Sequence, residues 1–256
     1  MASNLELIKD VDLVQAIQEA AVARWPNEAC GFVIQKGKKS VAIEVPNSSA
    51  EPTYTFLIDP KDYLAALEQG EIIGVWHTHA EAPATPSMAD LAGCEASDLP
   101  WYLMACNKRD DDFDLSELVC FRPGGFEAPY VGRPYAFGAL DCWTLTQDYY
   151  KREFGIALCP FPRIEEFWKK DGSNYMGDQW EKPGFIEMPR RTQPEIGDCF
   201  LFQTDGSGNP NHIAVYVGDG RILHHARGRL STTDPYEGYW QKHTVRHLRH
   251  KERIDQ

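Results

Sequence analysis

One stretch, residues 75–90, decides how the first half of this chain folds: Val75-Trp76-His77-Thr78-His79-Ala80-Glu81-Ala82-Pro83-Ala84-Thr85-Pro86-Ser87-Met88-Ala89-Asp90. His77 and His79 end an apolar run typical of a buried strand, and residues i and i+2 of a strand point to the same face. Ser87 then opens a helix, so that Asp90, one turn inside it, can face back toward the end of the strand. Two histidines and one carboxylate leave a fourth tetrahedral position for water, as in a catalytic zinc site. The alternative is structural, because Ser-Met-Ala-Asp is also an ordinary capping box and His-Thr-His can be two satisfied polar residues.

The whole pattern resembles the signature of the JAMM metalloproteases. That signature consists of His-x-His, seven residues, Ser-x-x-Asp and an upstream Glu-x-x-Gly, which this chain carries as Glu28-Ala29-Cys30-Gly31. The proline that usually follows the second histidine is Ala80 here, at a position that is not a ligand. The resemblance implies an N-terminal α/β JAMM metalloprotease fold in which Glu28 is the general base and Ser87 hydrogen-bonds the developing oxyanion. It also implies that Zn²⁺ is held by three ligands, His77, His79 and Asp90.

Composition and charge favour a folded protein with two unlike halves. A chain of 256 residues with 43% apolar and 12% aromatic residues is expected to form one large or two modest domains. The net charge of −12 lies almost entirely in residues 1–122, where nine Lys and Arg face twenty Asp and Glu, which argues against nucleic-acid binding there. The seven cysteines include no Cys-x-x-Cys pair, which argues against a disulfide framework or a cysteine-rich zinc ribbon. No signal peptide and no membrane span are predicted, so we expect the chain to be made and folded in a cytosol.

Periodicity places the first domain at residues 1–122. Helices are predicted at 10–25, 60–69 and 87–95, and strands at 31–34, 40–45, 54–58, 71–79, 101–105 and 116–121. Asp110-Asp111-Asp112 is interpreted as a solvated turn, with a weak calcium site as the open alternative. Residues 123–134 are rich in proline and glycine, which indicates a linker before a second domain at 135–256.

The second domain carries a candidate nucleophile, Cys142. It follows Asp141 and leads into a predicted helix at 144–154, and a helix N-terminus stabilises thiolate. Further on, a strand is predicted at 195–202 and a hairpin at 211–225, with histidines at both outer ends of the hairpin. The motifs Tyr-x-x-Gly-x-x-Asp-Cys, His-x-x-x-Tyr-x-Gly-Asp-Gly and Ile-x-His resemble the NlpC-type papain-like cell-wall peptidases. The serine usual after the cysteine is Trp143 here.

This second resemblance implies a C-terminal α+β papain-like NlpC fold and a set of roles. Cys142 would be the nucleophile, His212 the base, His224 the residue that orients the base, and Tyr135 a residue that lines the substrate site. The pattern alone leaves His224 and His225 open. A two-residue turn pairing Gly218 with Arg221 puts His225 on the face of His212, whereas a three-residue loop puts His224 there.

Two further segments have less specific interpretations. Residues 155–194 are long and aromatic, and their Trp168, Trp180 and Phe185 are predicted to be satellite core, with substrate selection or docking as the alternative. The basic run at residues 243–253 is predicted to be a solvated C-terminal tail, and a docking segment is the alternative.

A JAMM domain followed by an NlpC-type domain resembles the arrangement of the tail-tip assembly proteins of lambda-like phages. The resemblance implies a peptidase of a phage tail tip whose cysteine domain cuts peptidoglycan stem peptides, between D-glutamate and diaminopimelate, while the zinc domain processes a tail protein or another amide. The implied partners are peptidoglycan and tail-tip and tape-measure-type phage proteins. The implied locations are the host cytoplasm during assembly and then the virion tail tip. The alternatives are a structural assembly factor with little or no catalysis, and a cytosolic isopeptidase or secreted toxin.

Overall fold

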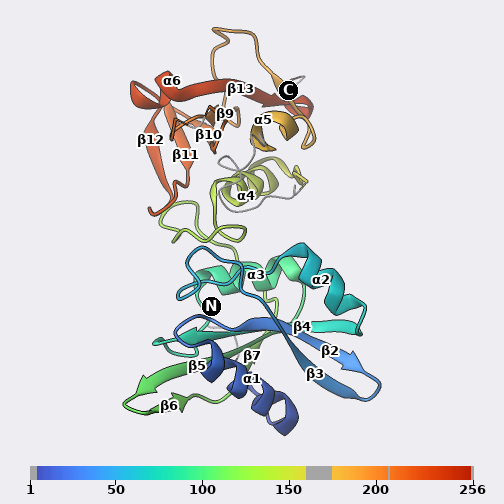
Figure 1. Cartoon of the computed structure of the whole chain (residues 1–256). Helices are drawn as coiled ribbons and strands as arrows, with labels where there is room; N and C mark the ends of the chain where they lie inside the picture. The colour runs from blue at the N-terminus through green and yellow to red at the C-terminus, as the bar shows by residue number, and fades with distance from the viewer. Residues whose placement is uncertain (1–4, 160–174, 207, 255–256) are drawn as a thin grey trace. The chain divides into compact units, whose positions relative to one another are not determined.

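The computed structural model describes residues 5–159, 175–206 and 208–254, and the chain divides into two compact units, Met1–Glu127 and Ala128–Gln256 (Figure 1). The first unit is α/β and the second is α+β, as predicted. No helix among the described residues is long and apolar enough to cross a membrane. The exact ends of the two domains stay predictions.

The first unit is built on a mixed sheet. Its elements are β1 (Glu6–Leu7), α1 (Val11–Arg24), β2 (Cys30–Lys36), β3 (Lys39–Val45), α2 (Pro60–Leu67), β4 (Glu71–Ala80), α3 (Met88–Ser97), β5 (Trp101–Arg109), β6 (Asp112–Leu115) and β7 (Val119–Phe121). The strand order is β1-β7-β5-β4-β2-β3, with β6 paired to β5. Among the paired strands of this sheet in the described residues, only β4 and β5 run parallel, and α3 connects them. That crossover brings the start of α3 back to the end of β4.

Alternation along β4 divides the core into two layers. Trp76 packs with Leu13 and Ile17 of α1 on one face. Val75 packs on the other face with Ala66 of α2 and Cys94 of α3, and Figure 1 shows these helices on opposite sides of the sheet. Because side chains alternate along a strand, the odd-numbered histidines of β4 lie on the face that α3 covers.

Two of the elements predicted in the first unit are wrong. Residues 54–58 form a loop and not a strand, because their backbone bonds to the Asn47 side chain: the Leu57 N–H donates to Asn47 Oδ1 at 3.1 Å, and Asn47 Nδ2 donates to the Thr55 carbonyl at 3.0 Å. The strand predicted at 116–121 is wrong over its first three residues: only Val119–Phe121 form a strand, β7, and β6 precedes it at Asp112–Leu115. Asp110 lies in the β5–β6 turn with φ of 48°, and among the described residues no His, Cys, Asp or Glu group there converges as a metal site would.

The second unit packs helices against an antiparallel sheet. Its elements are α4 (Cys142–Phe154), α5 (Tyr175–Gln179), β8 (Phe185–Glu187), β9 (Cys199–Phe202), β10 (His212–Gly218), β11 (Arg221–His224), β12 (Thr232–Pro235), α6 (Tyr239–His243), β13 (Thr244–His250) and the 3₁₀ turn η2 (Lys251–Arg253). The strand order is β12-β11-β10-β9-β13-β8. Leu145 and Tyr150 of α4 are buried against Ile213 and Val215 of β10. The core therefore anchors α4 directly to the strand that begins with His212.

The prediction of a solvated basic tail is wrong, since residues 244–250 form β13 between β9 and β8. Leu248 is fully buried, and Arg249 donates to both carboxylate oxygens of buried Asp198 at 2.7 and 2.9 Å. This pairing explains how a basic segment can enter a sheet. Of the aromatic residues predicted as satellite core, Phe185 lies in the main core of this unit and Trp180 packs against it, whereas Trp168 lies outside the described residues.

Candidate metal centre and candidate thiol site

Three side chains of the first unit converge as a candidate metal centre. The Nε2 atoms of His77 and His79 are 3.3 Å apart, and the two oxygens of Asp90 lie 3.2 Å from His77 Nε2 and 3.3 Å from His79 Nε2. All three residues are buried. Lone-pair-bearing atoms packed this closely need a proton or a cation among them, so two imidazoles and a carboxylate fit a metal ion.

Neighbouring groups orient the ligand atoms. His79 Nδ1 lies 2.9 Å from the Pro83 carbonyl, which can only accept, so Nδ1 carries the proton and Nε2 keeps its lone pair for the site. Burial by itself lowers the pKa of His79, but hydrogen bonding to Asp90 and its charge raise that pKa overall. Although burial opposes it, His77 and His79 hold the pKa of Asp90 well below its usual range. Asp90 is therefore a carboxylate at neutral pH.

Ser87 and Asp90 form the capping box that was the structural alternative for this stretch. The Ser87 N–H donates to Asp90 Oδ2 at 2.6 Å, and the Asp90 N–H donates to Ser87 Oγ at 3.1 Å. The cap holds Asp90 toward the histidines, so the structural and the metal-binding interpretations describe one arrangement. The bond from Asp90 uses a lone pair of the Ser87 hydroxyl and not its proton.

Glu28 is held beside this centre by hydrogen bonds between its neighbour Ala29 and Thr78, one of them to the Thr78 hydroxyl. The neighbouring Ala29 exchanges two 2.9 Å bonds with Thr78, the residue between the two histidines. Burial raises the pKa of Glu28 to about 8, with the charge of His79 opposing and that of Asp90 adding to the rise. A cation at the adjacent histidines would lower that pKa again and favour the carboxylate, the form that accepts a proton.

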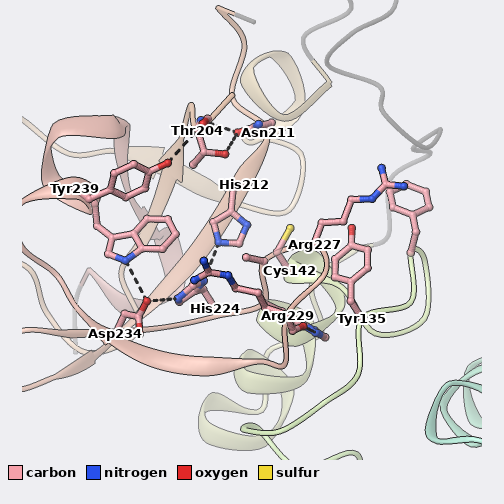
Figure 2. Close-up of a pocket in the computed structure, with 14 residues that line it drawn as sticks. Tyr135, Cys142, Thr204, Asn211, His212, His224, Arg227, Arg229, Asp234 and Tyr239 are labelled. Carbon is pink, nitrogen blue, oxygen red and sulfur yellow. Dashed lines mark hydrogen bonds and ion pairs between the residues drawn. The ribbon is translucent and has the colours of Figure 1, made fainter. Parts of the chain in front are cut away.

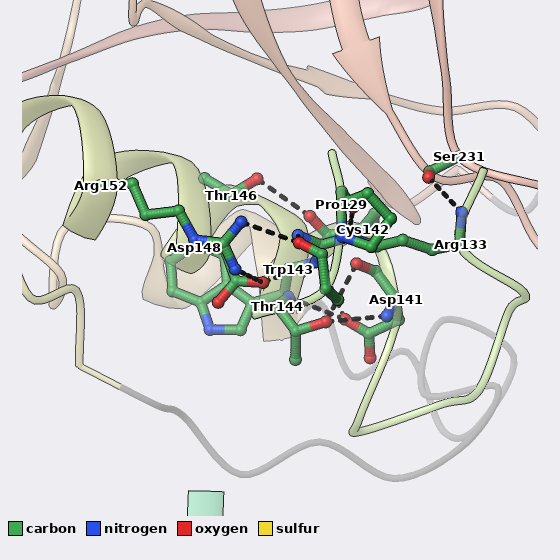
Figure 3. A network of polar contacts seen from close by, with 11 residues as sticks. Pro129, Arg133, Asp141, Cys142, Trp143, Thr144, Thr146, Asp148, Arg152 and Ser231 are labelled. Carbon is green, nitrogen blue, oxygen red and sulfur yellow. Dashed lines mark hydrogen bonds and ion pairs between the residues drawn. The ribbon is translucent and has the colours of Figure 1, made fainter. Parts of the chain in front are cut away.

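In the second unit, the sequence around Cys142 builds a well-capped helix N-terminus. The Asp141 carboxylate accepts from the Trp143 and Thr144 N–H groups at 2.9 and 3.0 Å, and the Asp141 N–H donates to Thr144 Oγ1 at 2.8 Å. Cys142 is the first residue of α4 and is only 6% exposed (Figure 3). Its thiol therefore lies at the positive end of a thirteen-residue helix, where a thiolate is favoured.

A cavity of about 490 Å³ brings together the residues predicted for the thiol site. Its lining includes Tyr135, Cys142, His212 and His224, and the thiol and both imidazoles point into it (Figure 2). His212 Nε2 lies 3.2 Å from His224 Nδ1. The alternative residue, His225, also lines the cavity, but its Nε2 lies 3.1 Å from the Arg229 carbonyl and its ring packs edge-on against Tyr135.

The choice between His224 and His225 comes from an irregularity in the β10–β11 hairpin. Gly218 pairs with Arg221, as for a two-residue turn, but the register shifts between Tyr216 and Gly218, so that Ala214 pairs with His224. Because of the extra residue in this bulge, the strands beyond it pair in the register that a three-residue loop would give. Thus His224 shares the face of His212 although the turn itself has two residues.

Several residues that line the cavity were missed from the sequence, and two of them, Asp234 and Trp240, contact the histidines. Asp234 Oδ2 lies 3.1 Å from His224 Nε2 and accepts from Trp240 Nε1 at 3.3 Å. The Trp240 ring packs on His224 with centroids 4.5 Å apart. Neither belongs to a recognisable motif, and the only sequence signal is the β-branched pair Thr232-Thr233 just before Asp234.

The histidines of this cavity are held neutral by burial. Burial, with the nearby His224 and His225, holds the pKa of His212 well below its usual range. Burial also lowers the pKa of His224, against the opposing effect of Asp234, and lowers that of His225 to about 4. A neutral imidazole is the form that can accept a proton from a thiol.

Comparison with known proteins agrees with both predicted families. Family models for prokaryotic homologs of the JAB domain and for the NlpC/P60 family match residues 10–118 and 132–249. The chain is 34% identical over 241 residues to tail tip assembly protein K of Escherichia phage N15, covering 93% of this chain and 94% of that protein. It is 34% identical over 196 residues to tail tip assembly protein K of Escherichia phage lambda, covering 76% and 89%. Murein DD-endopeptidase MepH of Escherichia coli (strain K12) is 29% identical over 123 residues, covering 45% of this chain and 40% of that protein.

Proposed function

The chain belongs to the family of tail tip assembly protein K, and from this premise we propose that its second unit is a cysteine peptidase that cleaves the stem peptides of peptidoglycan. The observation that supports this proposal most directly is the shared cavity, in which the capped thiol of Cys142 meets the paired imidazoles of His212 and His224. The murein-directed name of a relative that matches 45% of this chain supports the choice of substrate.

The proposed reaction uses the protein's own groups. His212 takes the proton of the Cys142 thiol, and the thiolate attacks the carbonyl carbon of the scissile peptide bond. His212 then returns the proton to the leaving amine, and in the second half of the reaction it removes a proton from the water that hydrolyses the thioester. His224 orients His212 through the 3.2 Å contact between their rings.

Charge at the mouth of the cavity supports an anionic peptide substrate. Arg227 and Arg229 line it and are exposed, in a chain whose net charge is −12. Stem peptides carry free carboxylates next to their peptide bonds, and guanidinium groups pair with carboxylates in a fixed geometry. The bond between D-glutamate and diaminopimelate is flanked by such carboxylates and is the one we propose.

We further propose that His77, His79 and Asp90 of the first unit hold Zn²⁺, and that this unit hydrolyses an amide of a tail protein or of the cell wall. Bound zinc would supply a Lewis acid that polarises a carbonyl and activates water. Glu28 would accept the proton of that water at its carboxylate and pass it to the leaving amine. The Ser87 hydroxyl would donate a hydrogen bond to the oxygen on which charge develops.

The family also suggests where the protein acts. We propose that it meets tail-tip and tape-measure-type proteins in the host cytoplasm during assembly, and that it reaches peptidoglycan at the virion tail tip.

Mass spectrometry of digested peptidoglycan tests the main proposal. Wild type and Cys159→Ala, which changes an exposed cysteine, should release the same new stem-peptide fragments, and Cys142→Ala should release none. The fragments should persist in the double variant His77→Ala with His79→Ala. Fragments from Cys142→Ala would contradict the proposed nucleophile, and no fragments from any folded sample would favour a structural assembly factor.

Metal analysis tests the first unit separately. We expect one zinc ion per chain in the wild type and in Asp114→Asn, which removes an exposed carboxylate of β6. The double histidine variant should bind none while the second unit stays folded. Zinc retained by that variant would contradict the ligand assignment.

A further inference from the structure

The site around Cys142 continues beyond the two histidines into a hydrogen-bonded chain. His212 Nε2 lies 3.2 Å from His224 Nδ1, and His224 Nε2 lies 3.1 Å from Asp234 Oδ2. Asp234 comes from β12, which pairs with β11 next to His224. Three strands therefore contribute one group each to the chain.

Two linked neutral imidazoles leave the direction of their hydrogen bond undetermined. Each neutral ring carries one N–H, so either His212 Nε2 or His224 Nδ1 can be the donor. The two directions are not equivalent for catalysis. If His224 donated, the proton of His212 would sit on Nδ1, and His212 would have no lone pair to accept the proton of the thiol.

Asp234 removes this ambiguity. A carboxylate only accepts, so it requires the proton of His224 on Nε2 and leaves a lone pair on Nδ1. His212 must then donate from Nε2, and its Nδ1 keeps a lone pair. Figure 2 shows the second ring nitrogen of His212 on the side of Cys142. The carboxylate thus sets the proton positions two rings away.

The surroundings of Asp234 suit this role. Trp240 Nε1 donates to the same oxygen, Oδ2, at 3.3 Å. The Trp240 ring also packs against His224 and His212, with centroid distances of 4.5 and 5.6 Å, and so keeps water from the chain. His224 and His212 are 2% and 6% exposed, and hydrogen bonds are stronger where water is excluded. Among the described residues, Arg229 and His225 also act on the charge of these histidines.

We propose that Asp234 is a positioning residue that, held by Trp240, fixes the tautomers of His224 and His212 so that His212 presents a bare Nδ1 to the Cys142 thiol. The proposal rests on the proposed cysteine peptidase function. It adds a carboxylate and an indole to Cys142, His212 and His224, which the sequence motifs identify.

Nitrogen-15 NMR of the histidine rings tests the tautomers directly. The measurement uses the full chain in a Cys142→Ala background, so that no thiol exchanges a proton with His212. With Asp234 present, we expect His212 and His224 to be protonated on Nε2 at neutral pH. Asp234→Ala should move proton occupancy of both rings toward Nδ1, whereas Asp219→Asn, which removes an exposed carboxylate in the β10–β11 turn, should not. Unchanged tautomers in folded Asp234→Ala would overturn the proposal.

Alkylation of Cys142 by iodoacetamide, followed on its own peptide by mass spectrometry, gives a readout that needs no substrate. In a serine triad, loss of the carboxylate that orients the catalytic histidine lowers kcat by up to about 10⁴-fold. Asp234 is one ring further from the nucleophile, so we expect Asp234→Ala to lower the alkylation rate of Cys142 by about 10–100-fold. Asp234→Glu should restore part of the rate, and Asp234→Asn, whose amide can donate as well as accept, should restore less. Equal alkylation rates in Asp234→Asn, Asp234→Glu and the wild type would overturn the proposal. The same comparison tests the proposal if Asp234→Ala does not fold. If the wild type does not cut peptidoglycan, the histidine tautomers and the alkylation rate can still be measured. The proposed peptidase function and the proposed role of Asp234 can therefore fail separately.

Discussion

Replacing His225 with glutamine should make the second unit less sensitive to acid. His225 is fully buried, its Nε2 lies 3.1 Å from the Arg229 carbonyl, and its Nδ1 has no hydrogen-bond partner among the described residues. Burial lowers the pKa of His225 to about 4. A glutamine amide can still donate to the Arg229 carbonyl but does not titrate.

The sign and size of the effect follow from proton linkage. In the unfolded chain a histidine has a pKa of about 6.5, so between about pH 6.5 and pH 4 the unfolded state binds a proton that folded His225 does not bind. The free energy of unfolding should therefore fall as the pH falls through this window. From pH 7 to pH 5 the contribution of His225 is about 1–2 kcal/mol, after allowance for relaxation and water near the site. His212 and His224, whose pKa values are also lowered, act in the same direction and remain in the variant.

Urea unfolding at both pH values measures the effect. Pulsed deuterium labelling, followed on peptides from β9 and β10, reports the second unit without interference from the first. The drop in stability between pH 7 and pH 5 should be about 1–2 kcal/mol smaller in His225→Gln than in the wild type. Equal drops in His225→Gln and wild type would refute the reasoning.

Two further predictions concern stability. Arg133→Met should destabilise the second unit by about 1–3 kcal/mol in urea unfolding, because the buried guanidinium donates to the Pro129 carbonyl and pairs with Asp148, which keeps Arg152 at 3.6 Å. A loss below about 0.5 kcal/mol would contradict this. Gly31→Ala should destabilise the first unit by about 3 kcal/mol or more, because the new Cβ would lie 1.9 Å from the Ile43 carbonyl oxygen. Gly124→Ala, whose Cβ would lie 3.8 Å from its nearest atom, should be near neutral. Similar thermal unfolding of the two variants would exclude the clash.

The sequence by itself determined the parts of both sites that depend on local geometry. The candidate metal centre needs only the two-residue period of β4 and the three-residue step of a capping box, so its residues, His77, His79 and Asp90, could be named from spacing and resemblance. Likewise, Asp141 followed by a helical pattern was enough to place Cys142 at a helix N-terminus.

Only the tertiary structure decided the features that depend on pairing between distant segments. A bulge in β10 selects His224 over His225, and its effect on register is not visible in the turn residues. Asp234 reaches His224 because β12 lies beside β11, and in β13 the basic run is stabilised by Asp198, which accepts from Arg249. These outcomes follow from hydrogen bonds and burial between residues far apart in sequence. Local periodicity carries no record of such contacts.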